Sequence, residues 1–266
     1  MPANIVPICD PADPRLAPYL RVRERDLVGR RGEFIAEGEV VLRVLLGGGA
    51  RCRANSLLVA QNRLTRLEPL IEGLDAPVYV AGQAVMDAVV GFHIHRGLLA
   101  HGLSPPDPGI EALLARLPRR ALVVTLFGVS NHDNVGGVFR NAAAFGADAL
   151  LLDGACCDPL YRKAIRVSVG AALKVPFARI GPDEDALALL ERAGFEAVAL
   201  SPGAAEQLSG VARSDRVAVL LGAEGPGLPD EVLARARPVG IAMAAGWDSL
   251  NVAAASAVVL HHFAAL

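Results

Sequence analysis

The stretch ALVVTLFGVSNHDNVGGVFRNAAAFGADALLL, residues 121–152, decides the fold class. Its first seven residues form a continuous apolar run, which is typical of a strand buried on both faces. A helix is predicted over Val135–Phe145 with Gly146 as its C-cap, and Ala149–Leu152 again has the pattern of a strand. Strand, helix and strand in this order predict a parallel α/β unit.

The same alternation continues to the C-terminus, and it predicts an α/β domain with a mainly parallel sheet covered by helices on both faces. In such sheets ligands bind outside the carboxyl ends of the strands, so we expect a functional site in the turns that follow them. The further strands are predicted at Lys174–Ala178, Ala197–Leu200, Val217–Leu221 and Val239–Met243, and the helices at about Pro159–Ala171, Glu184–Ala193, Asp230–Ala236 and from near Ser249.

A proline-rich segment, SPPDPG at residues 104–109, divides the chain. Its three prolines oppose both helix and sheet, so it predicts a linker. Before it, Glu33–Leu46 has helical spacing and short apolar runs follow, which predicts a small α/β domain. The predicted boundaries are 1–103 for the small domain, 104–118 for the linker and 119–266 for the larger domain.

The composition excludes several classes of protein. Hydrophobic residues make up 53% of the chain and charged residues 20%, which excludes a disordered protein. No basic lead-in followed by an apolar run opens the sequence, and no stretch of about 18 apolar residues is free of polar ones, so we expect neither a secretory signal nor a membrane span. Cys9, Cys52, Cys156 and Cys157 fit neither a disulfide framework nor a CxxC zinc pattern. We therefore predict buried free thiols and a cytoplasmic location.

Arginine is concentrated near the N-terminus. Eleven Arg and five Asp or Glu lie between Arg15 and Arg66, although the formal net charge of the chain is −2. Guanidinium groups make forked contacts with phosphate, so this stretch suggests a surface for RNA, while a general bias toward Arg would give the same enrichment without a function. The residues predicted to contact RNA are Arg21, Arg23, Arg25, Arg30 and Arg31.

Three segments after predicted strands carry candidate chemistry. In the first, Gly136 and Gly137 each cost about 1 kcal/mol relative to Ala in a helix, which indicates that another group approaches the backbone closely. Arg140 follows, and its spacing alone fits a surface arginine as well as a functional one. The second segment, LGAEGPGLP at residues 221–229, is a rigid loop with Glu224 as its one charge. It lacks the Gly-Lys-Ser/Thr of a phosphate-binding loop and the spacing of a dinucleotide loop.

The third segment, IAMAAGWDSLNV at residues 241–252, leads from a predicted strand into the last helix. Asp248 or Ser249 is expected to cap this helix. Asn251 then lies inside the first turn of an otherwise apolar helix, and capping by its neighbours does not explain it. His93 and His95 share a predicted strand face, but no Cys or carboxylate nearby completes a site, so no metal is predicted.

Together these segments resemble, over about Val123–Phe263, the three signature motifs of the SpoU (TrmH-like) branch of the SPOUT RNA methyltransferases. Ala242 stands where the family commonly has proline. The N-terminal part, with Phe34–Gly38 and Gly91–Gly97, is similar to the ribosomal-protein L30e-like RNA-binding module of the family. The matching residues are Asn134, Arg140 and Phe145-Gly146 in the first motif, Gly222, Glu224-Gly225 and Gly227-Leu228 in the second, Ile241, Met243 and Ser249–Val252 in the third, and Asp158-Pro159, Lys163, Arg166, Ser168 and Gly170 between the first two.

This resemblance implies a trefoil-knotted catalytic domain, a homodimer with its site near the subunit interface, and transfer of methyl from S-adenosylmethionine to a ribose 2′-hydroxyl in tRNA or rRNA. A catalytically silent RNA-binding relative with the same fold is the alternative, and a nucleotide-dependent oxidoreductase would need a glycine loop after the first strand, which is absent. The resemblance implies catalytic roles for Arg140, Asn134, Glu224, Ser249 and Asn251, and cofactor contacts by Leu200, Gly222, Ile241, Met243 and Leu250.

Overall fold

The computed structural model describes residues 3–20, 32–91, 93–94, 96–247 and 249–264. The chain forms two compact units. The first unit consists of Met1–Pro106 and Leu160–Lys174, and the second of Asp107–Pro159 and Val175–Leu266. The chain therefore leaves the second unit after Pro159, contributes a short segment to the first, and returns at Val175.

The second unit is built on a six-stranded sheet in the order β11-β9-β10-β6-β7-β8, and every neighbouring pair is parallel. This confirms the predicted α/β class with a parallel sheet. Its strands are β6 (Ala121–Leu126), β7 (Ala149–Leu152), β8 (Phe177–Arg179), β9 (Glu196–Leu200), β10 (Arg216–Leu221) and β11 (Arg237–Val239). Its helices are α5 (Ile110–Leu114), α6 (His132–Phe145), α8 (Ala186–Arg192), η4 (Leu208–Gly210), α9 (Asp230–Leu233) and α10 (Val252–Ala264).

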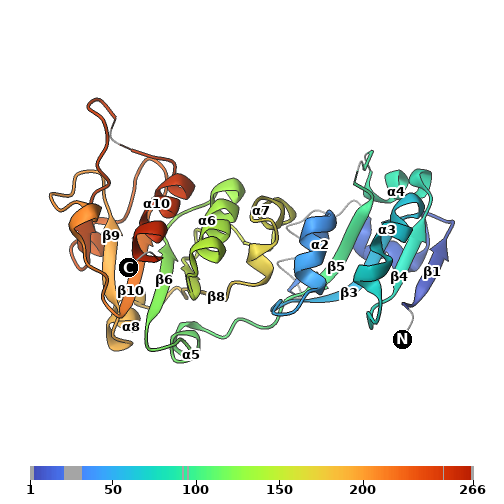
Figure 1. The fold of residues 1–266 in the computed structure, drawn as a ribbon, viewed down its shortest axis with the longest axis horizontal. Helices are drawn as coiled ribbons and strands as arrows, with labels where there is room; N and C mark the ends of the chain where they lie inside the picture. Colours follow the sequence, from blue (N-terminus) through green and yellow to red (C-terminus); the bar gives the residue numbers. More distant parts are fainter. Residues whose placement is uncertain (1–2, 21–31, 92, 95, 248, 265–266) are drawn as a thin grey trace. The chain divides into compact units, whose positions relative to one another are not determined.

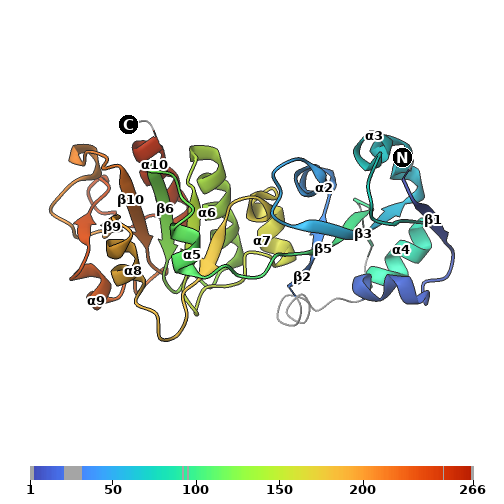
Figure 2. The ribbon, with the colours of Figure 1, turned by 90° about the horizontal axis from the view of Figure 1, so that it is seen from below.

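Helices cover both faces of this sheet, as the apolar strands require. On one face, buried side chains of α5, α8 and α9 join alternate residues of β6, β7 and β10 in one core cluster. On the other face α6 and α10 lie side by side in both views (Figures 1 and 2). Helix α5 lies inside the segment predicted as a linker, and its three apolar residues Ile110, Leu113 and Leu114 belong to the core of the second unit.

Close packing of α6 on α10 explains a glycine in the first candidate segment. A Cβ on Gly137 would lie 2.7 Å from the Cβ of Ala253, which is too close for two carbon atoms. The amide of Asn141 donates to the carbonyl oxygen of Ala253 at 2.7 Å and to the hydroxyl of Ser256 at 2.9 Å. The group that approaches the backbone at Gly137 is therefore the last helix of the same chain.

The first unit contains a mixed five-stranded sheet in the order β1-β4-β3-β5-β2, in which β1, β4 and β3 are parallel and β5 runs antiparallel to β3 and β2. Its strands are β1 (Ile5–Ile8), β2 (Glu33–Glu37), β3 (Arg53–Ala60), β4 (Val78–Ala81) and β5 (Leu98–Leu103). Its helices are η1 (Pro14–Tyr19), α2 (Glu39–Leu46), η2 (Gln61–Arg63), α3 (Leu64–Ile71), α4 (Gln83–Val90), α7 (Arg162–Val167) and η3 (Ala171–Leu173).

Several predicted elements differ from the structure. The helix predicted over Glu33–Leu46 is wrong in its first half, where β2 pairs with β5 and Gly38, with φ at 94°, turns the chain before α2 begins. Tertiary pairing of the strand overrides the helical spacing there. Strand β11 ends at Val239 instead of Met243, and α10 begins at Val252 instead of near Ser249. The four cysteines are free, but Cys9 is exposed, so the prediction that it is buried is wrong.

Candidate active site

A cavity of about 420 Å³ lies in the second unit, beside the carboxyl ends of β9, β10 and β11. The last residues of these strands, Leu200, Leu221 and Val239, all line it. Neighbouring parallel strands end at the same edge of the sheet, and the turns that follow them therefore converge. The residues of the predicted site that line this cavity are Leu200, Gly222, Glu224, Ile241, Met243, Ser249, Leu250 and Asn251.

The loop after β10 forms one wall of the cavity by folding back on itself. A Cβ on Gly222 would lie 2.2 Å from the carbonyl carbon of Gly227, so only glycine fits there. The N–H of Gly227 donates to the carbonyl oxygen of Ala223 at 3.0 Å, and Gly227 has a φ of 74°. This tight turn holds the exposed side chain of Glu224 at its tip, beside the cavity.

Asn251 connects three separate segments at this cavity. Its side-chain amide donates to Oδ1 of Asn134 on α6 at 2.8 Å and to Oε1 of Glu224 at 2.7 Å. Its own Oδ1 accepts from the backbone N–H of Ala253 at 2.9 Å, which caps α10. The cap of α10 is therefore Asn251 and not Ser249, which the sequence had predicted. Asp248, the other predicted cap, lies outside the described residues.

Asn134 is the buried end of this chain of hydrogen bonds. Its side chain lies at the first turn of α6, and the residue is only 6% exposed, whereas Glu224 and Asn251 are exposed. A buried amide oxygen needs a donor, and Asn251 supplies it. The sequence-predicted residues Asn134, Glu224 and Asn251 are thus brought together, although they are separated by up to 117 positions in the chain.

Arg140 is placed differently. It lies on the exposed surface of α6, it does not line the cavity, and its guanidinium makes neither a hydrogen bond nor an ion pair with another residue in the described part of the chain. A single copy of the chain therefore does not bring Arg140 to the cavity lining. Its predicted catalytic role stays a prediction.

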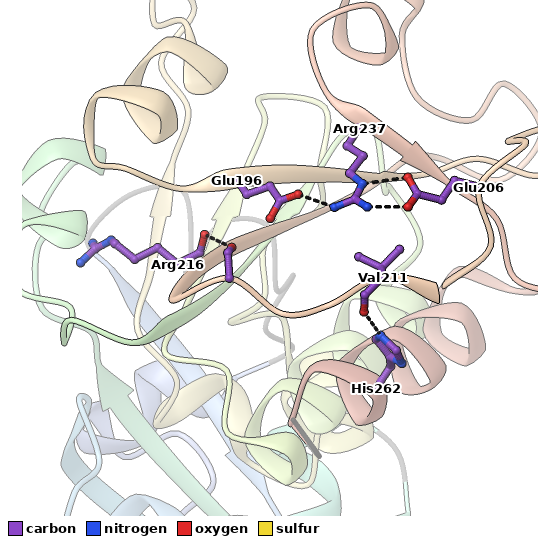
Figure 3. A network of polar contacts seen from close by, with 7 residues as sticks. Glu196, Glu206, Val211, Arg216, Arg237 and His262 are labelled. Atoms are coloured by element: carbon purple, nitrogen blue, oxygen red, sulfur yellow. Dashed lines mark hydrogen bonds and ion pairs between the residues drawn. The ribbon is translucent and has the colours of Figure 1, made fainter. Parts of the chain in front are cut away.

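An ion-pair network fixes two of the strands whose ends line the cavity. Figure 3 shows the guanidinium of Arg237, on β11, between the carboxylates of Glu196 on β9 and Glu206. Arg237 Nη1 donates to Glu196 at 2.7 Å and Nε donates to Glu206 at 2.8 Å. These hydrogen bonds hold the pKa of Glu206 below its ordinary value and raise the pKa of Arg237. Sequence reasoning missed this network, because nothing in the spacing of the three residues pairs them.

Sequence reasoning also missed some of the lining itself. Ala255 lines the cavity one helical turn after Asn251, on the same face of α10. The i, i+4 spacing from Asn251 is the signal that would have found it. Ser201 and Pro202, in the turn after β9, also contribute.

Other predicted residues lie outside this site. Arg21, Arg23, Arg25, Arg30 and Arg31 fall among the residues that the structure does not describe. The argument against a metal at His93 needs correction, because a carboxylate does lie nearby: Nδ1 of His93 is 2.8 Å from Asp87 Oδ2. Across residues 3–264, with the gaps named above, no three His, Cys, Asp or Glu side chains gather as a metal site would require. The helices in the same part of the chain are too short or too polar to cross a membrane.

Comparisons with known proteins find similar sequences and similar structures. A family model described as the SpoU rRNA Methylase family matches residues 121–261. An uncharacterized tRNA/rRNA methyltransferase of Mycobacterium bovis is 38% identical over 97% of this chain and 91% of its own length. Among solved structures, an RNA 2′-O ribose methyltransferase matches with a TM-score of 0.77 at 25% identity over 97% of each chain. An AdoMet bound rRNA methyltransferase from Sinorhizobium meliloti has the same fold, with a TM-score of 0.78 at 22% identity over 98% of this chain and 97% of its own.

Proposed function

Because this chain belongs to the SpoU rRNA methylase family, we propose that it transfers a methyl group from S-adenosylmethionine to a ribose 2′-hydroxyl of a structured RNA, either tRNA or rRNA. The observation that carries the proposal is the hydrogen-bonded chain of Asn134, Asn251 and Glu224 at the cavity beside three strand ends. The similarity to a protein described as an RNA 2′-O ribose methyltransferase supports the choice of the ribose oxygen.

The cavity suits S-adenosylmethionine, the cofactor that SpoU methyltransferases use. Its volume of about 420 Å³ is in the range of small-molecule sites. Leu200, Ile241, Met243 and Leu250 offer apolar surface for an adenine ring, and Gly222, which also lines the cavity, can contact the ligand through its backbone. When bound, the cofactor supplies an activated methyl group on a positively charged sulfur.

Glu224 and Asn251 are proposed to orient the ribose. Among the described residues Asn251 binds Oε1 of Glu224, which leaves Oε2 of this exposed carboxylate to accept a hydrogen bond from a substrate hydroxyl. Asn134 fixes the amide of Asn251 from the buried side. Ser249, which also lines the cavity, adds a second hydroxyl-binding group. Orientation of this kind contributes strongly to a transfer between two bound groups.

Arg140 is proposed to hold an RNA phosphate and so to position the nucleophile. A guanidinium has a pKa above about 12 and hardly ever releases its proton, so we assign it positioning and not proton removal. Its exposure on α6, away from the cavity lining of its own chain, supports a site that is completed by a second copy of the chain. We therefore propose a homodimer in which Arg140 of one protomer serves the cavity of its partner.

The proposal includes the finer features of the fold. We propose that the C-terminal segments form a trefoil knot, with α10 tucked beside the loop after β10, and the packing of α10 on α6 and β10 supports it. We propose that the small mixed sheet of the first unit is an L30e-like RNA-binding module, and that along the chain this module spans 1–103, a linker 104–118 and the methyltransferase domain 119–266. An enzyme that acts on tRNA or rRNA is expected in the cytoplasm.

Mapping of 2′-O-methyl groups in tRNA and rRNA, from cells with and without the gene, tests this function. We expect one ribose to lose its methyl group, which purified protein then restores with S-adenosylmethionine. Arg140→Ala is expected to abolish transfer while cofactor binding, measured by calorimetry, survives. Arg119→Ala, an exposed arginine with a 94% accessible side chain, is the matched control and should leave transfer unchanged. Normal transfer by Arg140→Ala contradicts the assigned role.

Calorimetry with S-adenosylmethionine also separates the enzyme from the silent alternative. A relative that only binds RNA has no need of the cofactor, so absence of cofactor binding together with retained RNA binding favours that alternative. A methyl group that appears on a base instead of a ribose contradicts the 2′-hydroxyl assignment and leaves the family membership intact.

A further inference from the structure

A second cavity, of about 430 Å³, lies wholly within the first unit and has an unusual charge. Four arginines line it: Arg63 from η2, Arg66 from α3, Arg96 from the turn before β5, and Arg166 from α7. Segment 160–174, which returns to the first unit, thus supplies one of the four. Helix α7 of this segment, labelled in Figure 1, packs on β2, and its neighbour η3 packs on α2. None of these four residues was assigned a ligand by sequence reasoning.

The acidic residues at this cavity are already neutralised by arginines. Glu39 accepts hydrogen bonds from Arg43 at 2.8 Å and forms an ion pair with Arg66 at 2.9 Å, and these partners lower the pKa of its carboxyl. Glu37, which is 9% exposed, pairs with Arg162 at 3.4 Å. The side chains of Arg63, Arg96 and Arg166 form no hydrogen bond or ion pair with any other residue that the structure describes. Within the part of the chain that the structure describes, three positive charges around this cavity therefore have no ion-pair partner.

The start of α2 adds hydrogen-bond donors and a partial positive charge to the same cavity. Gly38 is the N-cap residue, it provides no side-chain cap, and the first helical bond runs from the N–H of Leu42 to its carbonyl oxygen. The backbone N–H groups of Glu39, Val40 and Val41 therefore have no partner in the helix, and all three residues line the cavity. Helix N-termini of this kind carry a partial positive charge.

Arg96 lies directly over this helix start. A Cβ on Gly38 would be 3.0 Å from Nη1 of Arg96 and 3.3 Å from its Cδ. A guanidinium beside the positive end of a helix is an unfavourable arrangement by itself, and an anion between the two removes the conflict. The forked donors of arginine match the oxygen atoms of phosphate.

We propose that this cavity binds a phosphodiester group of the RNA substrate, held by Arg63, Arg96 and Arg166 and by the N–H groups at the start of α2. The inference rests on the proposed function for the identity of the RNA. Apolar neighbours such as Val40, Leu67 and Leu98 provide a surface for the attached sugar and base, which a volume of about 430 Å³ can hold. The first unit then contacts RNA through this cavity in addition to any contact by Arg21–Arg31.

The test is the salt dependence of RNA binding by the full chain, with bulk tRNA as the probe and without cofactor. Each phosphate contact contributes about 0.7–0.9 to the slope of log K against log salt concentration. Arg96→Gln and Arg166→Gln are each expected to lower the slope by about this amount, and the double variant by about twice as much. Arg53→Gln is the matched control, since Arg53 is an exposed arginine of the first unit that does not line the cavity.

The outcomes separate this inference from the proposed function. An unchanged slope in the double variant, or an equal fall in Arg53→Gln, overturns the phosphate site even if the protein methylates RNA normally. A reduced slope supports it even if no methyl transfer is found. Competition by inorganic phosphate or by adenosine monophosphate as strong as that by tRNA, per phosphate, shows a site for free anions and overturns the assignment to RNA. Unchanged circular dichroism and S-adenosylmethionine binding verify that the variants fold.

Discussion

Asn251 combines a structural and a functional role in one side chain, and two substitutions separate them. Asn251→Ala removes the cap of α10, and it also removes the donor to the buried Oδ1 of Asn134. Loss of an N-cap costs about 0.5–2 kcal/mol, and an unsatisfied buried acceptor costs about 1–3 kcal/mol. Because one side chain makes both contacts, we expect the free energy of unfolding to fall by about 1.5–5 kcal/mol in total.

Asn251→Asp keeps an oxygen in the capping position but removes the amide donor. It also places a second carboxylate against Glu224, whose Oε1 is 2.7 Å from the native amide nitrogen. Glu224 is exposed at the tip of its turn and can move away, so we expect Asn251→Asp to be more stable than Asn251→Ala by about 1 kcal/mol, the worth of the cap. Both variants should lose methyl transfer, since the donor to Glu224 is absent from each.

Urea denaturation followed by circular dichroism measures the first effect, and methyl transfer to RNA measures the second. Ser256→Ala is the matched control on α10, because it removes a buried hydroxyl of the same helix without touching Asn134 or Glu224. Wild-type stability in Asn251→Ala would refute the assignment of the cap. Substantial transfer by Asn251→Asp would show that the Asn134, Asn251 and Glu224 chain does not orient the substrate.

Three further predictions follow from the same structure. Gly137→Ala gains about 1 kcal/mol of helix propensity, but it forces a Cβ to 2.7 Å from the Cβ of Ala253, and overpacking of this kind costs about 1–3 kcal/mol. We therefore expect a lower melting temperature, which Ala253→Gly should restore. A rise in the melting temperature of Gly137→Ala contradicts the close packing of α6 on α10. Arg237→Gln should weaken S-adenosylmethionine binding, because it frees β11 from β9 beside the cavity. The pKa of Glu206 is lowered in the folded protein, so its ion pair stabilises the fold above the ordinary carboxyl pKa, and this stabilisation disappears as the pH falls through the lowered value. The free energies of unfolding of wild type and Arg237→Gln should therefore converge in acid. A difference in this free energy that stays constant with pH would argue against this pair. Cys9 has an exposed thiol, whereas burial raises the pKa of Cys52 to about 11 and that of Cys156 to about 12. A thiol reagent at pH 8 should therefore modify Cys9 first, and Cys9→Ser should abolish the fast phase of the modification.

The sequence by itself determined the fold class, and it predicted most of the residues that were then found to line the cavity. The apolar runs of β6, β7 and β10 are buried on both faces of a parallel sheet, and runs of this kind have few alternatives in a chain with helices between them. The convergence of turns after parallel strands indicated the loop that contains Gly222 and Glu224, whereas Asn251 was predicted from its unexplained place in an apolar helix and from the family resemblance.

Only the tertiary structure decided how those members meet. Local spacing predicted a helix where β2 pairs with β5, because pairing with a strand more than 60 residues away leaves no mark on nearby positions. Asn251 caps α10 with a side chain that also donates to Asn134 and Glu224, and local capping rules do not consider such distant partners. The four arginines of the second cavity come from three separate segments of the chain, and Arg166 joins the other three only because residues 160–174 fold back onto the first unit. Contacts between distant segments depend on packing in three dimensions, whereas propensity and periodicity are properties of neighbours along the chain.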